Sequence, residues 1–201
     1  MAVQSSDADA SGSSCERTIS PTSPGFLTVE LTGIHDIDGF VCARDLEAVK
    51  YLQIGIWDHL RKRNGSAYAF VASADPRCIL GYYHLVGSSL KRSVFQNADA
   101  KKIPKDGSVS VFHLAYIARD DRAEAGVGAA LVIDAARRAR SIYPTWGMSL
   151  HANNLKLVSF YQSLGFKFMR SLKQEQDSAT GVTSAPPFLM YADYASIIID
   201  S

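Results

Sequence analysis

One segment of the sequence constrains the fold more than any other, because a strand pattern, a glycine loop, a helix pattern and a second strand pattern follow each other in it. Apolar and β-prone residues indicate a buried strand over residues 108–117. An Ala-rich helix pattern covers 126–140 and ends in basic residues, which suit the helix dipole. Residues 147–152 read as a short strand. This order predicts a crossover between two parallel strands of one sheet.

The other patterns complete an α/β domain. Apolar alternation predicts strands at 26–34, 66–74, 78–86, 166–170 and 188–191, and helical periodicity predicts helices at 45–63 and 154–164. Asp75, Pro76 and Arg77 predict the turn between the second and third strands. Residues 88–107 are polar and basic and predict an irregular surface segment. The element order predicts a mixed sheet with helices on both faces.

Length and composition predict one domain with a disordered tail. Residues 1–25 are rich in Ser, Ala, Asp and Pro and hold too little apolar surface to repay ordering, so we expect the folded domain to span 26–201. The 201 residues are 47% hydrophobic, which suffices for one buried core. A formal net charge of +1 does not by itself demand a polyanionic partner.

Cysteine, histidine and hydropathy patterns indicate the compartment. The odd number of cysteines, Cys15, Cys42 and Cys78, leaves at least one free thiol, and their spacing suggests neither a disulfide framework nor a zinc site. The five histidines show no ligand spacing, so we expect no metal. No apolar run approaches the roughly 20 residues that cross a bilayer, and no signal peptide is visible. We therefore expect a cytoplasmic protein with no membrane partner.

The glycine loop is the first candidate for a ligand site. Gly126 and Gly128 at a helix start would present unpaired amides and a positive dipole end, which hold phosphates. The alternative is that small residues here only let the helix pack closely. Leu131 breaks a dinucleotide-binding G-x-G-x-x-G pattern, and no Gly-Lys-Ser/Thr follows as in a P-loop.

A second motif lies about 30 residues later. Asn154, Phe160, Tyr161, Gly165 and Phe166 occupy fixed positions of the segment 154–166. With the glycine loop, this segment resembles the GNAT acetyltransferase family, whose loop reads Q/R-x-x-G-x-G/A and whose later helix reads N-x-x-A-x-x-F-Y-x-x-x-G-F. The resemblance covers about residues 26–191. It implies the GNAT fold, with six to seven strands in a mixed central sheet, and acetyl transfer from acetyl-CoA to a primary amine.

Three shorter motifs resemble a branch of that family, the GNAT toxins of type II toxin–antitoxin pairs. They are Phe40-Val41-Cys42, Gly81-Tyr82-Tyr83 and His113-Leu114-Ala115, where the toxins carry F-x-C-G, G-Y-Y and G-R-L-A. Ala43 stands where Gly is usual, and His113 stands where Arg is usual. This resemblance implies aminoacyl-tRNA as the amine acceptor, an antitoxin as a partner, and a homodimer as a candidate assembly.

The family resemblance also implies site residues. Backbone groups of Ala115, Tyr116 and Ile117 would hold the pantetheine arm, and Tyr161 would be the general acid unless it is only a packed tyrosine. Asn154 would contact pantetheine or cap its helix. Ala123 stands where Gln or Arg is usual, so Arg122 would supply the missing cation. The pyrophosphate would lie on the loop residues Ala123, Glu124, Ala125, Gly126, Val127, Gly128 and Ala129.

Other readings stay open at this point. The acceptor would otherwise be a protein or small-molecule amine, or the domain would bind acetyl-CoA or a partner without catalysis. Basic residues at 61–63 and 91–105 would grip tRNA phosphates or form a solvated face. His113 would be a base, a positioning residue or a satisfied buried histidine. We expect one of Tyr82 and Tyr83 to be buried and the other to face the cleft.

Overall fold

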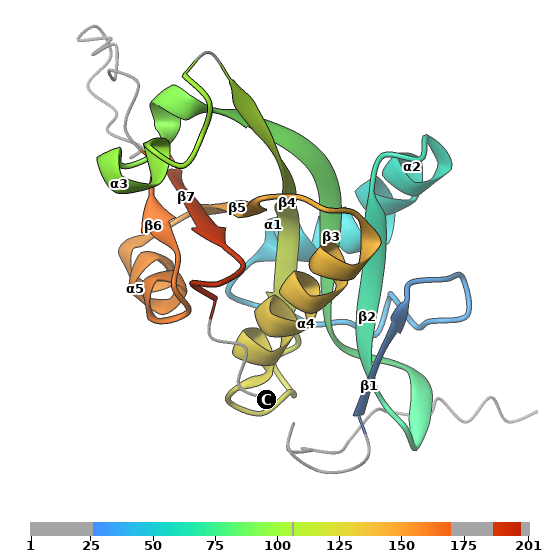
Figure 1. The fold of residues 1–201 in the computed structure, drawn as a ribbon. Coiled ribbons are helices and arrows are strands. Elements are labelled where there is room, and N and C mark those ends of the chain that lie inside the picture. The colour runs from blue at the N-terminus through green and yellow to red at the C-terminus, as the bar shows by residue number, and fades with distance from the viewer. Residues whose placement is uncertain (1–25, 106, 170–186, 198–201) are drawn as a thin grey trace, which may run out of the picture.

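The computed structural model describes residues 26–105, 107–169 and 187–197, and these form a seven-stranded sheet in the order β1-β2-β3-β4-β5-β7-β6 (Figure 1). β4 and β5 are parallel, whereas all other neighbouring strands are antiparallel. The predicted crossover and mixed sheet are therefore confirmed. The strands are β1 Phe26–Glu30, β2 Ser66–Ala72, β3 Asp75–Lys91, β4 Ser108–Arg119, β5 Gly147–Ala152, β6 Lys167–Phe168 and β7 Phe188–Asp193.

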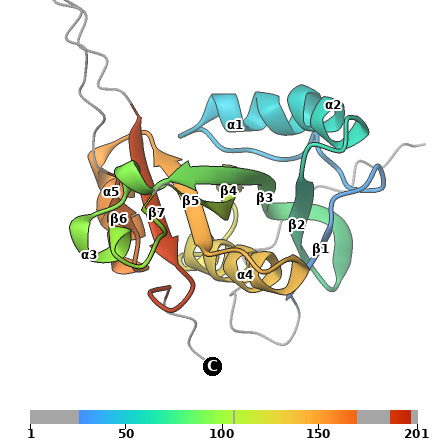
Figure 2. The ribbon, with the colours of Figure 1, turned by 45° about the horizontal axis from the view of Figure 1, so that its top comes forward.

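Helices cover both faces of the sheet, as predicted (Figure 2). α1 and α2 lie on one face, with a π-helical turn between them that keeps residues 46–61 continuously helical, while α4 and α5 lie on the other. The helical elements are α1 Leu46–Lys50, η1 Tyr51–Gly55, α2 Ile56–Arg61, η2 Arg92–Val94, α3 Asn97–Ala100, α4 Val127–Ile142 and α5 Leu155–Ser163. The predicted tail, residues 1–25, lies outside the described residues.

Each face of the sheet has its own core cluster. α4 lies close to the sheet because Ala135, Ala136 and Ala139 are fully buried beneath it. Tyr82 and Tyr83 are both completely buried, on opposite faces, because successive side chains of a strand alternate. The expectation that one of them faces the cleft is therefore wrong.

Both tyrosines are held by hydrogen bonds as well as by packing. The Tyr82 hydroxyl donates to the Ala48 carbonyl oxygen at 2.6 Å, which ties the sheet to α1. The Tyr83 hydroxyl donates to Asp134 on α4 at 2.6 Å. These bonds satisfy polar atoms that burial would otherwise leave without a partner.

The turn between β2 and β3 lies earlier than predicted. β2 ends at Ala72 and β3 begins at Asp75, so residues 73–74 make the turn and Pro76 lies inside the strand. Register shifts on either side of Val71 displace the pairing near the strand end. A proline is tolerated at such an irregular strand end, where it removes no regular ladder bond.

The sequence predicted an irregular surface segment at residues 88–107, but part of this segment is regular and packed against the rest of the domain. β3 continues to Lys91, and Phe95 and Ile103 are buried with Tyr191 in a third small cluster. The carboxylate of Asp99, which is 2% exposed, accepts hydrogen bonds from the Tyr191 hydroxyl and from the amino groups of Lys167 and Lys102 at 2.9, 2.9 and 3.2 Å. These hydrogen bonds attach the segment around Asp99 to β6 and β7.

The described residues bear on the cysteines, on membrane-spanning helices and on metal sites. Cys42 is a free, buried cysteine, but Cys78 is disulfide-bonded, so the expectation of no disulfide is wrong for Cys78. Within residues 26–105, 107–169 and 187–197, no helix is long and apolar enough to span a membrane. No group of three His, Cys, Asp or Glu side chains suited to a metal is found in the same residues.

We predict that Asp99→Asn lowers the free energy of unfolding by about 2 kcal/mol, because the two lysine amino groups lose a buried carboxylate partner. Thermal or chemical unfolding measures this change. Asp58→Asn is the matched control, since Asp58 forms comparable pairs with Arg61 and Lys62 in solvent and should contribute far less. Equal effects of the two substitutions would contradict an anchoring role for Asp99.

Candidate active site

The sheet opens between β4 and β5, and this opening defines the candidate site. The two strands pair only from Val111↔Gly147 to Leu114↔Leu150. Beyond this point β4 pairs only with β3, and the end of β5 pairs only with β7. A register shift also leaves Ala115 as an extra residue opposite β3. The side of β4 that carries Ala115, Tyr116 and Ile117 therefore lacks a neighbouring strand and is open to an extended ligand.

A cleft of about 670 Å3 lies at this opening, within the roughly 300–1,000 Å3 typical of small-molecule sites. Its walls come from the segment 42–47, from the end of β4 and from the start of α5. It brings together three residues that the sequence predicted for the site, Ile117, Asn154 and Tyr161. The lining residues are Cys42, Ala43, Arg44, Asp45, Leu46, Glu47, Ile117, Ala118, Arg119, Asp121, Asn153, Asn154, Lys156, Leu157 and Tyr161.

Tyr161 lies on α5 and is 4% exposed. Its ring packs against Phe160 and Phe166. No hydrogen-bond partner is seen for its hydroxyl among the described residues. Every fully buried polar side-chain atom in these residues has a partner, so the Tyr161 hydroxyl is not fully buried and reaches the cleft surface. Burial, together with the charge of Asp45, raises the pKa of Tyr161 to about 12. The hydroxyl is therefore protonated at neutral pH and suited to donate a proton.

Two carboxylates fix the start of the cleft wall formed by residues 42–47. The Val41 amide donates to Asp120 at 2.8 Å, and the Ala43 amide donates to Asp121 at 2.7 Å. Asp120 is fully buried. These contacts hold a segment nearly 80 residues away in sequence against the end of β4.

Arg122 completes this arrangement. Its guanidinium donates to both carboxylate oxygens of Asp120 at 2.7 and 2.8 Å and to the Gly39 carbonyl oxygen at 2.6 Å. A bidentate pair of this kind is geometrically specific and occupies the donors that a phosphate would need. The contacts favour a structural clamp, and a role of Arg122 toward pyrophosphate stays a prediction.

Cys42 contributes a thiol to the cleft wall, where it is 7% exposed. Burial raises its pKa, so the thiol is neutral at physiological pH. Because the thiolate is the nucleophilic form, this environment does not favour a covalent intermediate on Cys42.

The start of α4 has the features of an anion site. Gly126 occupies the N-cap with φ of 96°, a conformation that favours glycine, and the helix has no side-chain cap. In contrast, Asp45 caps α1, and Asn154 caps α5 by accepting a bond from the Leu157 amide at 2.9 Å. The predicted capping role of Asn154 is therefore confirmed. The side chains of Ala123 and Val127 are buried, whereas Ala125 and Gly126 between them are exposed.

Arg119 orients the loop before α4. Its Nη1 donates to the carbonyl oxygens of Ala123 and Glu124 at 2.7 and 2.8 Å. In a trans peptide the following amide points away from the carbonyl, so the N–H groups of Glu124 and Ala125 are directed away from Arg119. With the exposed cations Arg44 and Lys156, Arg119 also adds positive charge to the cleft. No local pattern marked any of these three residues.

The opposite face of the opening carries two histidines. His113 on β4 and Ser149 on β5 share a hydrogen bond of 3.0 Å between Nδ1 and Oγ, and the His113 and His151 rings lie 5.0 Å apart. The neighbours Met148 and Leu150 pack under α4 and α5, so Ser149 and His151 point the other way. Burial, with a smaller effect of His151, lowers the pKa of His113 to about 4. His113 is therefore neutral at physiological pH.

An aromatic network of Tyr51, His84 and Tyr116 packs beside the end of β4. The Tyr116 ring stacks on Tyr51 from the π-helical turn, with centroids 3.5 Å apart. The Asn64 carbonyl can only accept, so His84 Nε2 donates to it at 3.0 Å and His84 Nδ1 accepts from the Tyr51 hydroxyl at 2.8 Å. This network fixes Tyr116 next to the open edge of β4.

The arrangement has solved counterparts. No protein-family model and no curated protein matches the sequence. A mutant of KacT matches with a TM-score of 0.70 at 22% identity, over 86% of this chain and 96% of its own. AtaT complexed with acetyl-methionyl-tRNAfMet matches with 0.69 at 24%, over 85% and 96%. AtaTR bound with acetyl-CoA matches with 0.64 at 25%, over 86% and 95%.

These neighbours are GNAT toxins of type II toxin–antitoxin systems. The chain therefore has the GNAT fold, and the predicted fold class is confirmed. At these identities the comparison concerns the fold, and the roles of individual site residues stay predictions.

The depressed pKa of His113 predicts a pH-dependent loss of stability. Because the folded state favours the neutral ring, this contribution is complete above pH 6.5 and is lost as the pH falls from 6.5 toward 4. We expect His113→Gln to remove on the order of 2 kcal/mol of that decline, allowing for partial exposure of the ring. Urea unfolding at a series of pH values measures it. A constant offset between the two proteins at every pH would contradict the assignment.

Proposed function

We propose that this protein is an N-acetyltransferase that transfers the acetyl group of acetyl-CoA directly to the amino group of aminoacyl-tRNA. The observation that carries the proposal is the open edge of β4 beside a cleft that holds the protonated hydroxyl of Tyr161. The structures of AtaTR with acetyl-CoA and of AtaT with acetyl-methionyl-tRNA support it. Incubation with labelled acetyl-CoA and charged tRNAs tests it, with proteins and small amines as competing acceptors.

The residues of the cleft suggest how acetyl-CoA would be held. The backbone groups of residues 115–117 on the edge of β4 away from β3 would bond the pantetheine amides in the manner of an added strand. The amides of residues 123–129, at the uncapped start of α4, would face the pyrophosphate, and Arg119 would keep them outward. Ala123 cannot supply the positive charge of an arginine at its position, so Arg44 and Lys156 would supply it instead.

The reaction needs one bond to form and one to break. The neutral amine attacks the thioester carbonyl carbon, the carbon–sulfur bond breaks, and the sulfur leaves with the electron pair. Tyr161 donates its hydroxyl proton to that sulfur, and the nitrogen loses a proton to solvent. His113, with a pKa of about 4, is too weak a base to take that proton at neutral pH, and neither His113 nor His151 lines the cleft. Cys42, as a neutral thiol, takes no part in a covalent step.

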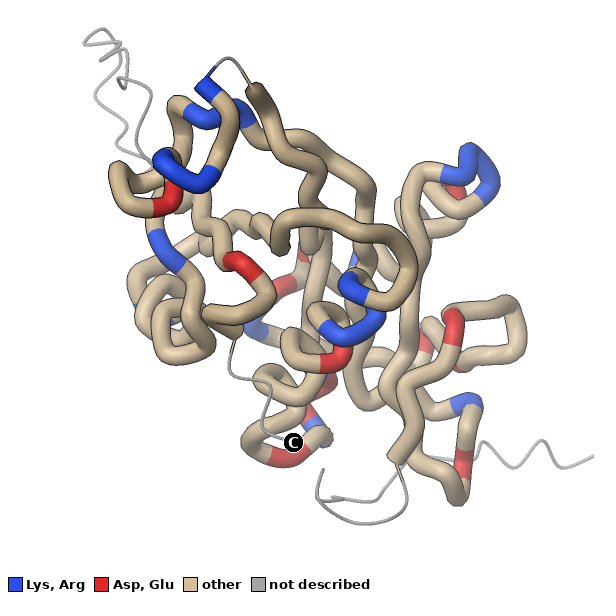
Figure 3. Tube along the Cα trace, viewed as in Figure 1, with Lys and Arg blue, Asp and Glu red and all other residues tan. Residues whose placement is uncertain are grey.

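The acceptor assignment is supported by the distribution of charge. Among the Lys and Arg of the described residues, two groups lie at the two upper corners of the view in Figure 3. One group is Arg61, Lys62 and Arg63 at the end of α2. The other, here called the 91–105 basic segment, comprises Lys91, Arg92, Lys101, Lys102 and Lys105. Two separated basic groups are suited to phosphates of a large RNA.

The same neighbours support further parts of the proposal. AtaT has also been solved bound to the C-terminus of the antitoxin AtaR, so an antitoxin is the proposed protein partner. The predicted homodimer stays a prediction. An acceptor of the aminoacyl-tRNA class would place the protein in the cytoplasm.

We predict that Tyr161→Phe lowers kcat by about 100-fold, because loss of the phenolic proton removes general acid catalysis. The Kd for acetyl-CoA should change little, since the ring remains in place. Steady-state kinetics and calorimetry measure the two quantities. Tyr143→Phe is the matched control, because Tyr143 is 60% exposed and does not line the cleft. Wild-type turnover by Tyr161→Phe on every acceptor would remove Tyr161 from the mechanism.

The 91–105 basic segment should contribute to the affinity for charged tRNA. Replacing Lys91, Lys101 and Lys105 by Gln should raise the KM for charged tRNA by about 10-fold at moderate salt and weaken its salt dependence. Lys102 is left unchanged, because it pairs with Asp99. Kinetics at several salt concentrations measure the effect. An unaltered KM at every salt concentration would instead favour a protein or small-molecule amine as the acceptor.

A further inference from the structure

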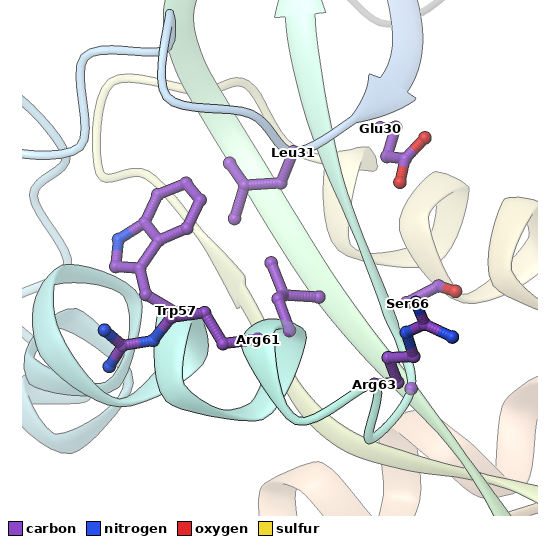
Figure 4. Close-up of a pocket in the computed structure, with 8 residues that line it drawn as sticks. Glu30, Leu31, Trp57, Arg61, Arg63 and Ser66 are labelled. Atoms are coloured by element: carbon purple, nitrogen blue, oxygen red, sulfur yellow. The ribbon is translucent and has the colours of Figure 1, made fainter.

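A surface pocket of about 830 Å3 lies at the carboxyl end of α2 (Figure 4). Its walls come from the end of β1, from α2 and from the turn that leads into β2. The lining residues are Glu30, Leu31, Trp57, Leu60, Arg61, Arg63, Gly65 and Ser66. None of them lines the cleft that contains Tyr161, so this pocket is a separate feature.

An apolar wall with a large aromatic ring forms one side of this pocket. In Figure 4 the indole of Trp57 and the side chain of Leu31 lie near each other, on α2 and after β1. Leu31 is buried, whereas Trp57 is half-buried and packs against the same core cluster. An indole that is fixed by packing on one side and open on the other is a surface on which a planar ring can stack.

Arg63 occupies a position where arginine is unfavourable for folding. Its φ is 55°, in the left-handed region, directly after the helix cap residue Lys62. The helix end is closed by bonds from the Arg63 amide to the Leu60 carbonyl and from the Asn64 amide to the His59 carbonyl, at 3.0 and 2.9 Å. Glycine is the usual residue at this position of such an ending. The arginine side chain therefore has no folding advantage here, which points to a role in binding.

Gly65 lets the turn pack closely against β3. Its φ is 95°, and a Cβ at this position would collide with the Leu85 carbonyl oxygen. Arg63 therefore lies between a hydrogen-bonded helix end and a turn that packs closely against β3.

The charges of the pocket select among ligands. Asp58 pairs with Arg61 and Lys62 at 3.3 and 2.6 Å. Among the described residues no ion pair is seen for Arg63. Glu30 is on the facing strand end and would accept hydrogen bonds from amino or ring N–H groups. A ligand with a planar ring, N–H donors and a phosphate matches this set, whereas an acidic peptide would leave the indole unused and face Glu30.

We propose that this pocket binds a short single-stranded stretch of the RNA acceptor, with an unstacked base on Trp57 at one end and a phosphate at Arg63 at the other (Figure 4). The inference rests on the proposed function in assigning the RNA to an aminoacyl-tRNA. The 91–105 basic segment lies at the other upper corner of the same view (Figure 3), so a large RNA can contact both. The pocket is a positioning site and takes no part in acetyl transfer.

Direct binding tests the pocket without relying on catalysis. The probe is a labelled single-stranded RNA oligonucleotide, and fluorescence anisotropy measures its Kd. Trp57→Leu and Arg63→Gly should each raise the Kd by about 10-fold, through loss of stacking and of the phosphate contact. Arg63→Gly should also keep or raise Tm, because glycine accepts the left-handed conformation. Arg77→Gln, which removes an arginine paired with Asp75 in solvent, should leave the Kd unchanged.

Two outcomes would overturn the inference. One is an unchanged Kd for Arg63→Gly, which remains decisive even if Trp57→Leu fails to fold. The other is displacement of the RNA by an acidic peptide with equal potency from wild type and from Trp57→Leu, which would assign the surface to a protein partner.

Kinetics separate this inference from the proposed function. With charged tRNA, Arg63→Gly should raise KM by about 10-fold and leave kcat unchanged, whereas with a small aminoacyl ester neither value should change. If wild type acetylates no charged tRNA, the proposed function fails while the binding result still decides the pocket. If wild type acetylates charged tRNA and Arg63→Gly has the same KM, only the inference fails.

Discussion

The separation of β4 from β5 after Leu114 and Leu150 is the constraint on which the rest of the structure depends. A continuous ladder would satisfy the backbone groups of residues 115–119 on both sides and leave no room for a ligand. Because the strands part at their carboxyl ends, the loop before α4 and the start of α5 both lie at the mouth of the opening. The separation of β4 from β5 therefore accounts for the positions of the cleft, the anion site and the candidate acid Tyr161.

Such an opening is stable only if its walls are held from outside. Four consecutive residues at the end of β4 do this. Arg119 bonds the loop that follows it, Asp120 and Asp121 bond the segment 41–43, and Arg122 neutralises buried Asp120. This arrangement also gives a physical account of Ala123, since the ordering of the loop is performed by Arg119 rather than by the side chain at 123.

Local chemistry made much of this predictable from the sequence. α4, β5 and α5 lie close to their expected bounds because periodicity, the Asn154 cap and Gly165 at φ of 93° mark them. The turn at 73–74, the burial of both Tyr82 and Tyr83, and the anchoring of Asp99 depend on pairing between distant residues, which no local pattern records. In the same way motifs indicated Tyr161 and the glycine loop, whereas Arg119, Ser149 and His151 became visible only across strands.

Burial has opposite chemical consequences on the two faces of the opening. On the α5 face it raises the pKa of Tyr161, and on the α1 face it lowers the pKa of His113, because in each case the charged form is the one disfavoured. A protonated phenol and a neutral imidazole therefore coexist at neutral pH without an ion pair between them. Acetyl transfer to an amine gives a proton to the sulfur and takes one from the nitrogen. Tyr161 has the proton for the first transfer in place, whereas His113 is too weak a base for the second, so the proton of the nitrogen leaves to the solvent that the open cleft admits.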